Sequence, residues 1–433
     1  MKFIVLIVSL ISTSTFAQRL LTVQEAIDFA LKNNYDIRLV NNQAEGYAVD
    51  NAYADAAFIP MLNGTASKIW NDNSQKQNFT DGRKRQADVN SNNLNAAVNL
   101  DWTLFDGLKM FATRSRLSAL KNFGELTVRT QVVNSIAAVI SNYYNIVRQK
   151  QLLRAIDTLM PIYQERVDLA DKKYSVGLGA KPELLQAKVD LNAQKAARLL
   201  QETLIAQLRA QLNQLTGMPV NEVYEVTDSI PINPDLNYEN VATDIEKYNP
   251  GLLAIRKSID VADFALQERK AERLPIVQFN SAYNFGKTNN GTVVNPEFQP
   301  IFSLNKGFNY GFSAVVPLLN GFNSRRLIRQ AGLTLDYNQI SYETQLSGVQ
   351  LSLSNSFKDY QYQKKALMLE EENILLAKEN VFIALERFKQ GVTTNLELRD
   401  AQISLQDAYS RLIAARYNTK LAETELLRIK GTL

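Results

Sequence analysis

The segment Tyr174-Ser175-Val176-Gly177-Leu178 decides the fold, because a related segment, Phe388-Lys389-Gln390-Gly391-Val392, follows later in the chain. The glycines of the two segments stand at positions 177 and 391, an offset of 214 residues. Further pairs of identical residues keep this offset: Leu184 and Leu398, Ala187 and Ala401, Gly107 and Gly321, and Gly217 and Gly431. Upstream, Asn34 and Pro60 match Asn249 and Pro275 after one inserted residue. Agreement at so many positions indicates an internal duplication.

The predicted elements follow the same order in each copy. We expect two structural repeats, 18–217 and 241–433, joined by a linker at 218–240. In each repeat, helical sequence precedes a β-hairpin, predicted at 60–105 and 275–317, and a long helix and a shorter helix follow it. The predicted helices cover about 22–58, the stretch from the first hairpin to Val176, 182–215, 241–273, 322–390 and 395–430.

Short-range signals mark where some of these helices begin. Thr22 is followed three residues later by Glu25, which is the spacing of a capping box. Asp106-Gly107 and Asn320-Gly321 stand where a predicted strand passes into a helix. A sharp turn with an Asp or Asn side chain available for capping accounts for both dipeptides, so we assign them no chemistry.

The predicted helices are long enough to belong to coiled coils or helical tubes. The last one carries small and large apolar residues at spacings of three and four: Leu398, Ala401, Leu405, Ala408, Leu412, Ala415, Thr419, Ala422, Leu426 and Ile429. This heptad pattern predicts close packing against neighbouring helices in a long wall. An ordinary amphipathic helix on a soluble bundle is the alternative.

Two hairpin regions show the period of two that is typical of strands. The predicted apolar faces are Leu94, Ala96, Val98, Leu100 and Trp102; Val277, Phe279, Tyr283 and Phe285; and Phe308, Tyr310, Phe312, Ala314 and Val316. The opposite faces are rich in Asn, a pattern that favours barrel strands with one face in lipid and one in water over a soluble β-sandwich. The linkers 71–93 and 287–306 are polar and predict surface loops. Because four strands cannot close a barrel, and an open edge cannot lie in lipid, several chains must share one barrel.

The first residues predict a secretory signal peptide at 1–17. Lys2 precedes an apolar run from Phe3 to Ile11, and Ala17 offers a cleavage site. The apolar run is far shorter than the roughly 20 residues that a membrane-spanning helix needs. The sequence therefore predicts export.

The composition excludes several classes of function. The chain has 433 residues, no cysteine, no histidine and a formal charge of +4. It therefore lacks the thiol and imidazole groups that most often serve as nucleophiles, bases and zinc or haem ligands. The near balance of charge argues against a binder of nucleic acid. We expect no cofactor, no metal site and no enzymatic activity.

The duplicated order of elements, with Val176-Gly177-Leu178 and Gly391-Val392-Thr393 at the two turns, resembles the TolC family of outer-membrane efflux proteins. The resemblance covers essentially the whole chain after the signal peptide. It implies a membrane protein of the α+β class, a homotrimer in which four strands from each chain form a shared twelve-stranded β-barrel. A long α-helical barrel would continue this β-barrel into the periplasm. The implied partners are a periplasmic adaptor (membrane fusion) protein, an inner-membrane RND or ABC transporter and outer-membrane lipid, without nucleic acid.

The resemblance also implies which residues act. The adaptor-docking tip would comprise Val176, Gly177, Leu178 and Gly179 in the first turn and Gly391, Val392, Thr393 and Thr394 in the second. The family typically has Ser or Thr where Gly179 stands, so this position departs from its pattern. On the residues alone, the glycines predict helix C-caps with nothing docked.

Two acidic residues are candidates for the pore entrance. Glu397 and Asp400 are three residues apart, so they share one face of the predicted helix. In the resembled family, acids at these offsets line the constricted entrance, where threefold repetition makes acidic rings. A solvated helix surface is the alternative interpretation.

We interpret the sequence as the outer-membrane exit duct of a tripartite efflux system, a passive conduit that docks to an adaptor and a pump. The outer-membrane component of a type I protein secretion system is an alternative within the same class. A periplasmic coiled-coil scaffold with a soluble β-domain is the alternative from a different class.

Overall fold

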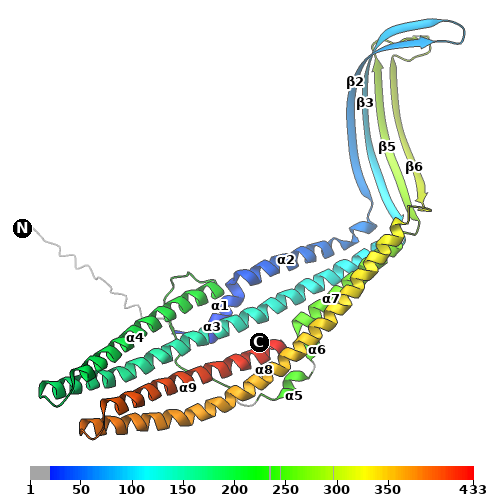
Figure 1. Cartoon of the computed structure of the whole chain (residues 1–433). Coiled ribbons are helices and arrows are strands. Elements are labelled where there is room, and N and C mark those ends of the chain that lie inside the picture. The colour runs from blue at the N-terminus through cyan, green and yellow to red at the C-terminus, as the bar shows by residue number, and fades with distance from the viewer. Residues whose placement is uncertain (1–19, 234–235, 244, 296) are drawn as a thin grey trace, which may run out of the picture. The chain divides into compact units, whose positions relative to one another are not determined.

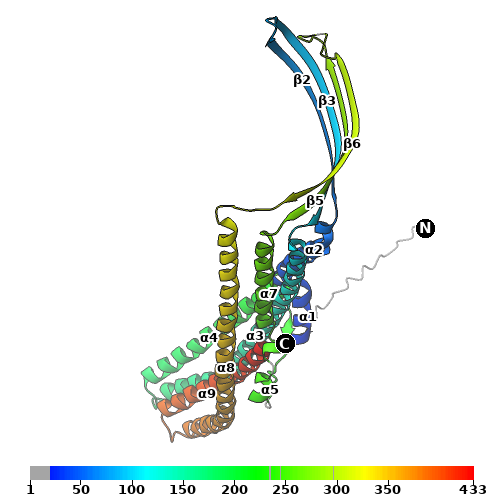
Figure 2. The ribbon, with the colours of Figure 1, turned by 90° about the vertical axis from the view of Figure 1, so that its right-hand side faces the viewer.

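A computed structural model describes residues 20–233, 236–243, 245–295 and 297–433 (Figures 1 and 2). The predicted signal peptide at 1–17 lies outside these residues. The chain divides into two compact units, and each unit takes segments from both halves of the sequence. Unit 1 comprises Met1–Gln43, Glu125–Leu253 and Glu343–Leu433, and unit 2 comprises Ala44–Gly124 and Ala254–Tyr342.

The elements confirm the duplicated order helix, strand, strand, long helix, helix. The first copy contains α1 (Val23–Asn33), α2 (Tyr35–Ala52), a 3-10 helix (Ala54–Phe58), β2 (Met61–Asn78), β3 (Lys84–Phe105), α3 (Lys109–Ser175) and α4 (Lys181–Thr216). The second contains α5 (Tyr238–Ala242), α6 (Ile245–Tyr248), α7 (Pro250–Ala271), β5 (Ile276–Asn290), β6 (Phe302–Val315), α8 (Asn323–Lys389) and α9 (Asn395–Lys430). Two short parallel strands, β1 (Leu20–Leu21) and β4 (Glu225–Val226), were not predicted. No helix of the described residues combines the length and the apolar character needed to cross a membrane.

The first predicted helix, 22–58, is interrupted, and the interruption shows the duplication at atomic detail. The capping box of Thr22 and Glu25 is confirmed, but α1 ends before Asn34 and α2 begins after it. The Asn34 side chain donates a 2.7 Å hydrogen bond to the carbonyl of Leu215, at the end of α4. Asn249 does the same 215 residues later, donating a 2.7 Å bond to the carbonyl of Ile429 near the end of α9. Each Asn also accepts a backbone N–H of the helix that follows.

The heptad prediction for α9 is confirmed. Every residue of the predicted seam from Leu398 to Ile429 is buried. The middle of the seam joins a cluster with Leu159 of α3, Leu191 of α4 and Val381 of α8. The small residues of α9 allow this close approach, as expected for a wall of packed helices. All four helices contribute to this cluster within unit 1.

Unit 2 contains a four-stranded antiparallel sheet in the order β2-β3-β5-β6 (Figure 2). Directly paired residues in such a sheet point to the same face. The register pairs Trp102 with Phe279 and Phe279 with Phe312, so the predicted apolar residues of three strands fall on one face, except for Val316, which lies beyond the end of β6. The same register pairs Leu62 of β2 with Leu100, which assigns a face to the first strand as well.

The predicted surface loops 71–93 and 287–306 were too long. β2 continues to Asn78 and β3 begins at Lys84, so the loop of the first hairpin is only 79–83. Likewise, β5 continues to Asn290 and β6 begins at Phe302, so both strands reach into the predicted loop. The polar composition misled the prediction, because strand pairing uses backbone groups and tolerates polar side chains on both faces where no lipid covers them.

The strand-to-helix junctions of unit 2 have the predicted turns. Asp106 accepts a 3.1 Å hydrogen bond from the backbone N–H of Met110, and Asn320 accepts one of 3.5 Å from Ser324. Gly107 has a φ of +74°, and a Cβ placed on it would lie 2.4 Å from the carbonyl oxygen of Ala271. Only glycine fits this close approach of backbone to backbone.

Candidate functional site

The first predicted docking turn lies between α3 and α4 and is a Schellman motif. The N–H of Leu178 donates a 2.8 Å hydrogen bond to the carbonyl of Lys173, and the N–H of Gly177 donates one of 3.1 Å to Tyr174. Gly177 has a φ of +76°, the left-handed conformation that this motif requires. The predicted helix C-cap is therefore confirmed at this turn.

The second turn, between α8 and α9, repeats the same motif. The N–H of Val392 donates a 3.0 Å hydrogen bond to Arg387, and the N–H of Gly391 donates one of 3.1 Å to Phe388. Gly391 has a φ of +74°. The Thr394 side chain then caps α9 by accepting the N–H of Glu397 at 3.3 Å. Both turns are thus closed by the same hydrogen bonds.

Both turns present bare apolar side chains. In a Schellman motif, the residue after the glycine often packs back on its own helix. Here Leu178 is 82% exposed and Val392 is 64% exposed, and Val176 is 67% exposed beside the first glycine. Capping requires none of these side chains to be large and apolar, so the turns themselves do not explain them.

The residue two positions after the glycine differs between the two turns. A Cβ on Gly179 would lie 3.0 Å from the Cβ of Lys173, so a side chain at this position would require Lys173 to shift slightly. Its counterpart Thr393 is buried and donates a hydrogen bond from its hydroxyl to the carboxylate of Glu397.

The two predicted pore-entrance acids lie in the first two turns of α9. Glu397 and Asp400 are both exposed in the single chain. The Glu397 carboxylate is held by Thr393, whereas Asp400 has no hydrogen-bond or ion-pair partner in the described part of the chain. Their spacing places them on adjacent turns of one helix.

A buried charged network, which the sequence analysis did not identify, lies one to three helical turns behind the docking turns. The Arg166 side chain of α3 is fully buried and pairs with Asp190 of α4. Arg166 also donates a 2.7 Å hydrogen bond to the Gln402 side chain of α9, and Arg399 of α9 reaches Asp190 at 3.2 Å. Residues of three helices therefore meet at one carboxylate. The available signal was Arg166, a charged residue between the buried Tyr163 and Ala170 of α3 at the spacing of a helix core.

The charges of this network stabilise the ionised form of Asp190. Burial acts to raise the pKa of Asp190, but hydrogen bonds from Arg166 and Gln186 and the positive charges of Arg166 and Arg399 outweigh it. The pKa of Asp190 therefore lies below the usual value of an aspartate. The carboxylate is charged at neutral pH and ties α4 to α3 and α9.

The two turns are also joined directly within unit 1. The Lys173 ammonium group of α3 lies 3.9 Å from the centre of the Phe388 ring of α8. Lys389 of α8 pairs with Glu165 of α3 at 3.0 Å. Leu385, Phe388 and Leu398 form a small core beneath. These contacts hold the turns side by side as one surface.

In unit 2, the face of the sheet opposite the apolar residues is polar and hydrogen-bonded. The Asn280 side chain donates a 2.8 Å bond to Asp101 and accepts one of 3.0 Å from Ser313. A hollow on this face is lined mainly by Asn63, Thr65, Asn99, Asp101, Asn280 and Asn309. Such a face suits water rather than lipid. Within the described residues, no group of acidic side chains is arranged to hold a metal ion.

Comparison with known proteins gives the family. The sequence matches the family model described as "Outer membrane efflux protein" over residues 26–218 and 241–432, which is most of the chain. The chain belongs to the outer membrane efflux protein family. As a member of this family, it is an outer-membrane protein that serves as the exit duct of an efflux system. Its helices form the part of the protein that lies in the periplasm.

Individual members of the family are distant in sequence and near in fold. Outer membrane protein TolC of Vibrio cholerae is 23% identical over 385 residues, which cover 87% of this chain and 83% of TolC. The alkaline protease secretion protein AprF of Pseudomonas aeruginosa is 20% identical over 433 residues, which cover 96% and 87%. The crystal structure of the Campylobacter jejuni CmeC outer membrane channel has a TM-score of 0.81 at 16% identity, covering 95% of this chain and 85% of that one. Membership in this family favours the duct over the periplasmic scaffold.

Proposed function

We propose that three copies of this chain form a passive duct that docks to a periplasmic adaptor and an inner-membrane RND or ABC transporter. The observation that carries the proposal is the pair of turns, closed by the same backbone hydrogen bonds, that expose Leu178 and Val392. In this proposal the chain itself is not an enzyme and needs no cofactor or metal. Transport energy comes from the inner-membrane partner.

The sheet supports assembly from several chains. Within the described residues, β2 and β6 each pair on one side only, so both long edges of the sheet are open. An open edge in lipid leaves backbone groups without hydrogen-bond partners, which costs several kcal/mol for each group. Pairing of β6 of one chain with β2 of the next satisfies both edges. Three chains with four strands each then close one twelve-stranded barrel.

The docking tip supports a partner that contributes apolar contacts. Its residues are Val176, Gly177, Leu178 and Gly179 of the first turn and Gly391, Val392, Thr393 and Thr394 of the second. The glycines, Thr393 and Thr394 shape the two turns, while Val176, Leu178 and Val392 offer the bare apolar surface. Burial of a side chain such as Leu178 against an adaptor contributes about 2 kcal/mol.

Glu397 and Asp400 are proposed to line the periplasmic entrance. Both are exposed near the start of α9, only one and two turns behind the tip. Threefold repetition would produce two rings of carboxylates, which attract cations and repel anions. Replacing both by Gln and Asn should reduce the preference of the open channel for cations in planar-bilayer conductance.

The repeat boundaries proposed from the sequence remain 18–217 and 241–433, with a linker at 218–240. The C-terminal ends of both repeats belong to unit 1. There the Asn34 side chain donates a hydrogen bond to the end of α4, and the Asn249 side chain donates one to the end of α9. The part of the linker around β4 pairs with β1 at the start of the first repeat.

The function is tested by efflux in a host whose own outer-membrane duct is deleted, with the cognate adaptor and pump supplied. The double variant Leu178→Ser and Val392→Ser should abolish drug resistance while the protein still reaches the outer membrane. The matched control is Leu199→Ser with Leu376→Ser, because these leucines are 63% and 59% exposed but lie away from the turns. Equal activity of the tip variant and the wild type would disprove docking through the turns.

Protein secretion is a second candidate function. The similarity to AprF, named for secretion of alkaline protease, extends over 96% of this chain. The same duct geometry serves either cargo, so the partners decide. Resistance to small toxic compounds with an RND pump supports efflux, whereas export of a protein substrate with an ABC transporter supports secretion.

A further inference from the structure

Three lysines interrupt the apolar face of the sheet in unit 2. Lys68 of β2 pairs with Leu94 of β3, which pairs with Lys287 of β5, so the two lysines share one row and one face. Lys306 of β6 lies one row away, opposite Phe285. The row of Lys68 therefore carries positive charge on a face that is otherwise mostly aliphatic and aromatic.

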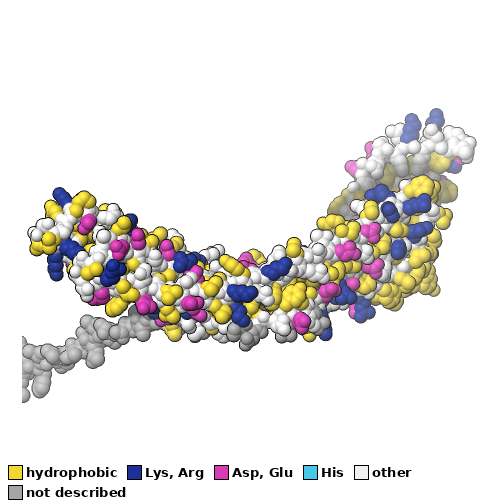
Figure 3. Space-filling view, turned by 60° about the horizontal axis from the view of Figure 1, so that its bottom comes forward, with side chains coloured by type: hydrophobic (Ala, Val, Ile, Leu, Met, Phe, Trp, Pro, Cys, Tyr) yellow, Lys and Arg dark blue, Asp and Glu magenta, His cyan; other side chains and the backbone are white. Residues whose placement is uncertain are grey.

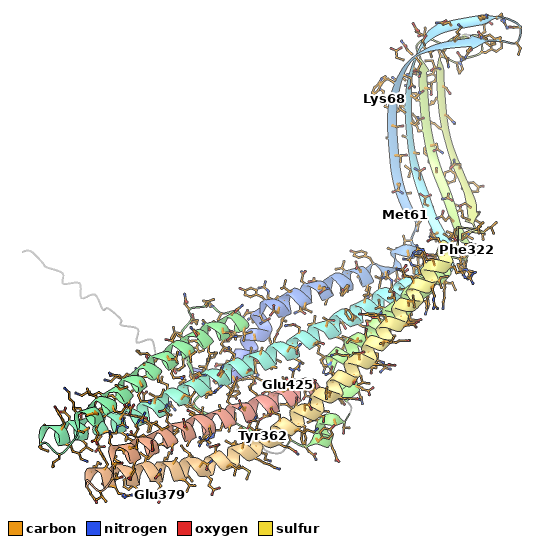
Figure 4. The ribbon with its side chains drawn as sticks, in the orientation of Figure 1. Met61, Lys68, Phe322, Tyr362, Glu379 and Glu425 are labelled. Atoms are coloured by element: carbon orange, nitrogen blue, oxygen red, sulfur yellow. The ribbon has the colours of Figure 1, made fainter. Side chains whose placement is uncertain are left out.

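The lysines lie at the end of the apolar band that is remote from the helices. The band begins near the helices with the row of Trp102, and Leu94 in the lysine row is eight residues further along β3. Eight residues of strand span about 27 Å, or about 20 Å of height for a barrel strand tilted by about 40°. This approaches the height of about 25 Å expected for the lipid-facing band. Figure 4 shows Lys68 well along β2 from Met61, where the strand begins.

Each lysine lies over an aromatic ring. The ammonium nitrogens lie 4.8 Å from the Trp70 ring centre for Lys68, 5.8 Å from that of Phe302 for Lys287, and 5.6 Å from that of Phe285 for Lys306. An aromatic ring supports the apolar stem of a lysine and leaves the ammonium group free to bind at the membrane surface.

The charge of these lysines is not neutralised by any carboxylate of the described residues. In the described part of the structure, none of the three lies within ion-pair distance of a carboxylate, whereas some basic side chains near the other end of the band do. Lys109 pairs with Glu272 at 2.9 Å, and Arg116 pairs with Glu268 at 2.8 Å. Arg273, Arg325 and Arg329, near the helical end, also lack a carboxylate within ion-pair distance in the described residues, so the three lysines are distinguished by their position on the apolar face and by their aromatic neighbours. An unpaired ammonium group at the boundary of the band attracts anionic groups at the membrane surface.

We propose that Lys68, Lys287 and Lys306 bind the phosphate groups of a phosphorylated lipid in the outer leaflet. Ammonium groups are point-charge ligands for phosphate, and the flanking aromatic rings suit the glycerol or sugar level of a lipid. Lys68 and Lys287 are two strands apart, which is a separation of about 10 Å. A headgroup that carries two phosphates can span this distance. The site anchors the barrel at the leaflet that faces away from the periplasm.

The test uses the full protein purified in detergent and titrated with lipid A that carries two phosphates, with binding followed by native mass spectrometry. Each lysine near an anionic lipid contributes about a fivefold gain in affinity. The triple variant Lys68→Gln, Lys287→Gln and Lys306→Gln should therefore bind up to about 100-fold more weakly. The corresponding Lys→Arg triple keeps the charges and should retain binding. Wild-type protein should lose affinity to a similar degree for lipid A from which both phosphates have been removed.

The matched control replaces three exposed lysines of the helices, Lys188, Lys195 and Lys358, by Gln. This variant has the same change in net charge and should bind like the wild type. Equal weakening in both triples would overturn the proposal, because it would reflect net charge alone. Unchanged binding in the Gln triple, or equal binding of dephosphorylated lipid A by the wild type, would also overturn it. If the triple Gln variant does not assemble, the three single Lys→Gln variants are measured instead. Each is expected to bind lipid A about fivefold more weakly than the wild type.

Discussion

Arg166 shows how a single buried charge shapes the periplasmic end of unit 1. Its guanidinium group is removed from water and its charge is balanced by Asp190, which also receives Arg399. A buried pair of this kind adds little net stability compared with apolar packing, but the loss of one partner is costly because the other charge is left uncompensated. The network therefore specifies which faces of α3, α4 and α9 meet.

Replacing Asp190 with Asn should cost about 3 kcal/mol of folding free energy at pH 7, because the buried Arg166 loses its counter-charge. The lowered pKa of Asp190 sets the sign of the pH dependence. The contribution is complete above the usual pKa of an aspartate and is lost as the pH falls through the lowered value. Thermal unfolding followed by circular dichroism should therefore show a difference between variant and wild type that shrinks in acid.

The control for this variant is Asp157→Asn. Asp157 pairs with Arg198 at 2.9 Å, but about half of its side chain is exposed, so water screens this pair and its loss should cost much less than the loss of Asp190. If both variants lose the same stability, Asp190 has no special role in the network.

Replacing Gly107 with Ala should destabilise unit 2 by about 3 kcal/mol. The new Cβ meets the carbonyl of Ala271, and the left-handed conformation adds its own strain. The control Gly46→Ala lies in α2 with no atom near its added Cβ, so it should be neutral or stabilising. Chemical unfolding of the two variants distinguishes these outcomes, and equal stability would contradict the contact at Gly107.

The elements were predicted from the sequence to different degrees. The long helices were predicted nearly to the residue, since Gly177, Gly391 and Gly431 end them and the repeat fixes the register. The break at Asn34 was missed because its reason is a hydrogen bond to Leu215, far along the chain. The polar extension of β2 and β3 was missed because polar strand residues that face no lipid have the composition of a loop.

The α9 seam predicts that a larger residue will not fit. Ala408 is buried among the apolar residues of α9, α3 and α8, so Ala408→Leu should cost about 2 kcal/mol by overpacking. Ser404→Leu in the same helix is exposed and should change stability by less than about 0.5 kcal/mol. Thermal unfolding of the purified proteins compares the two changes, and a stable Ala408→Leu variant would mean that the helices pack more loosely.

The whole chain combines a water-compatible helical part with a sheet that has one apolar and one polar face. On the face shown in Figure 3, basic and acidic side chains are interspersed along the surface, without a dominant patch of one sign. The sequence alone predicted the fold class, the family and the two turns. It did not predict the Arg166 network or the Lys68 row, because both depend on which helices and strands are neighbours.

In the proposed assembly the strands of three chains share one barrel, and the mass of the purified complex is the decisive measurement of that arrangement. The protein is extracted from the outer-membrane fraction in mild detergent and its mass is measured with the detergent contribution subtracted. The open edges of β2 and β6 require more than one chain, and the proposed trimer predicts a mass of three chains. A stable monomer extracted from the membrane would contradict the shared barrel, and with it the proposed duct.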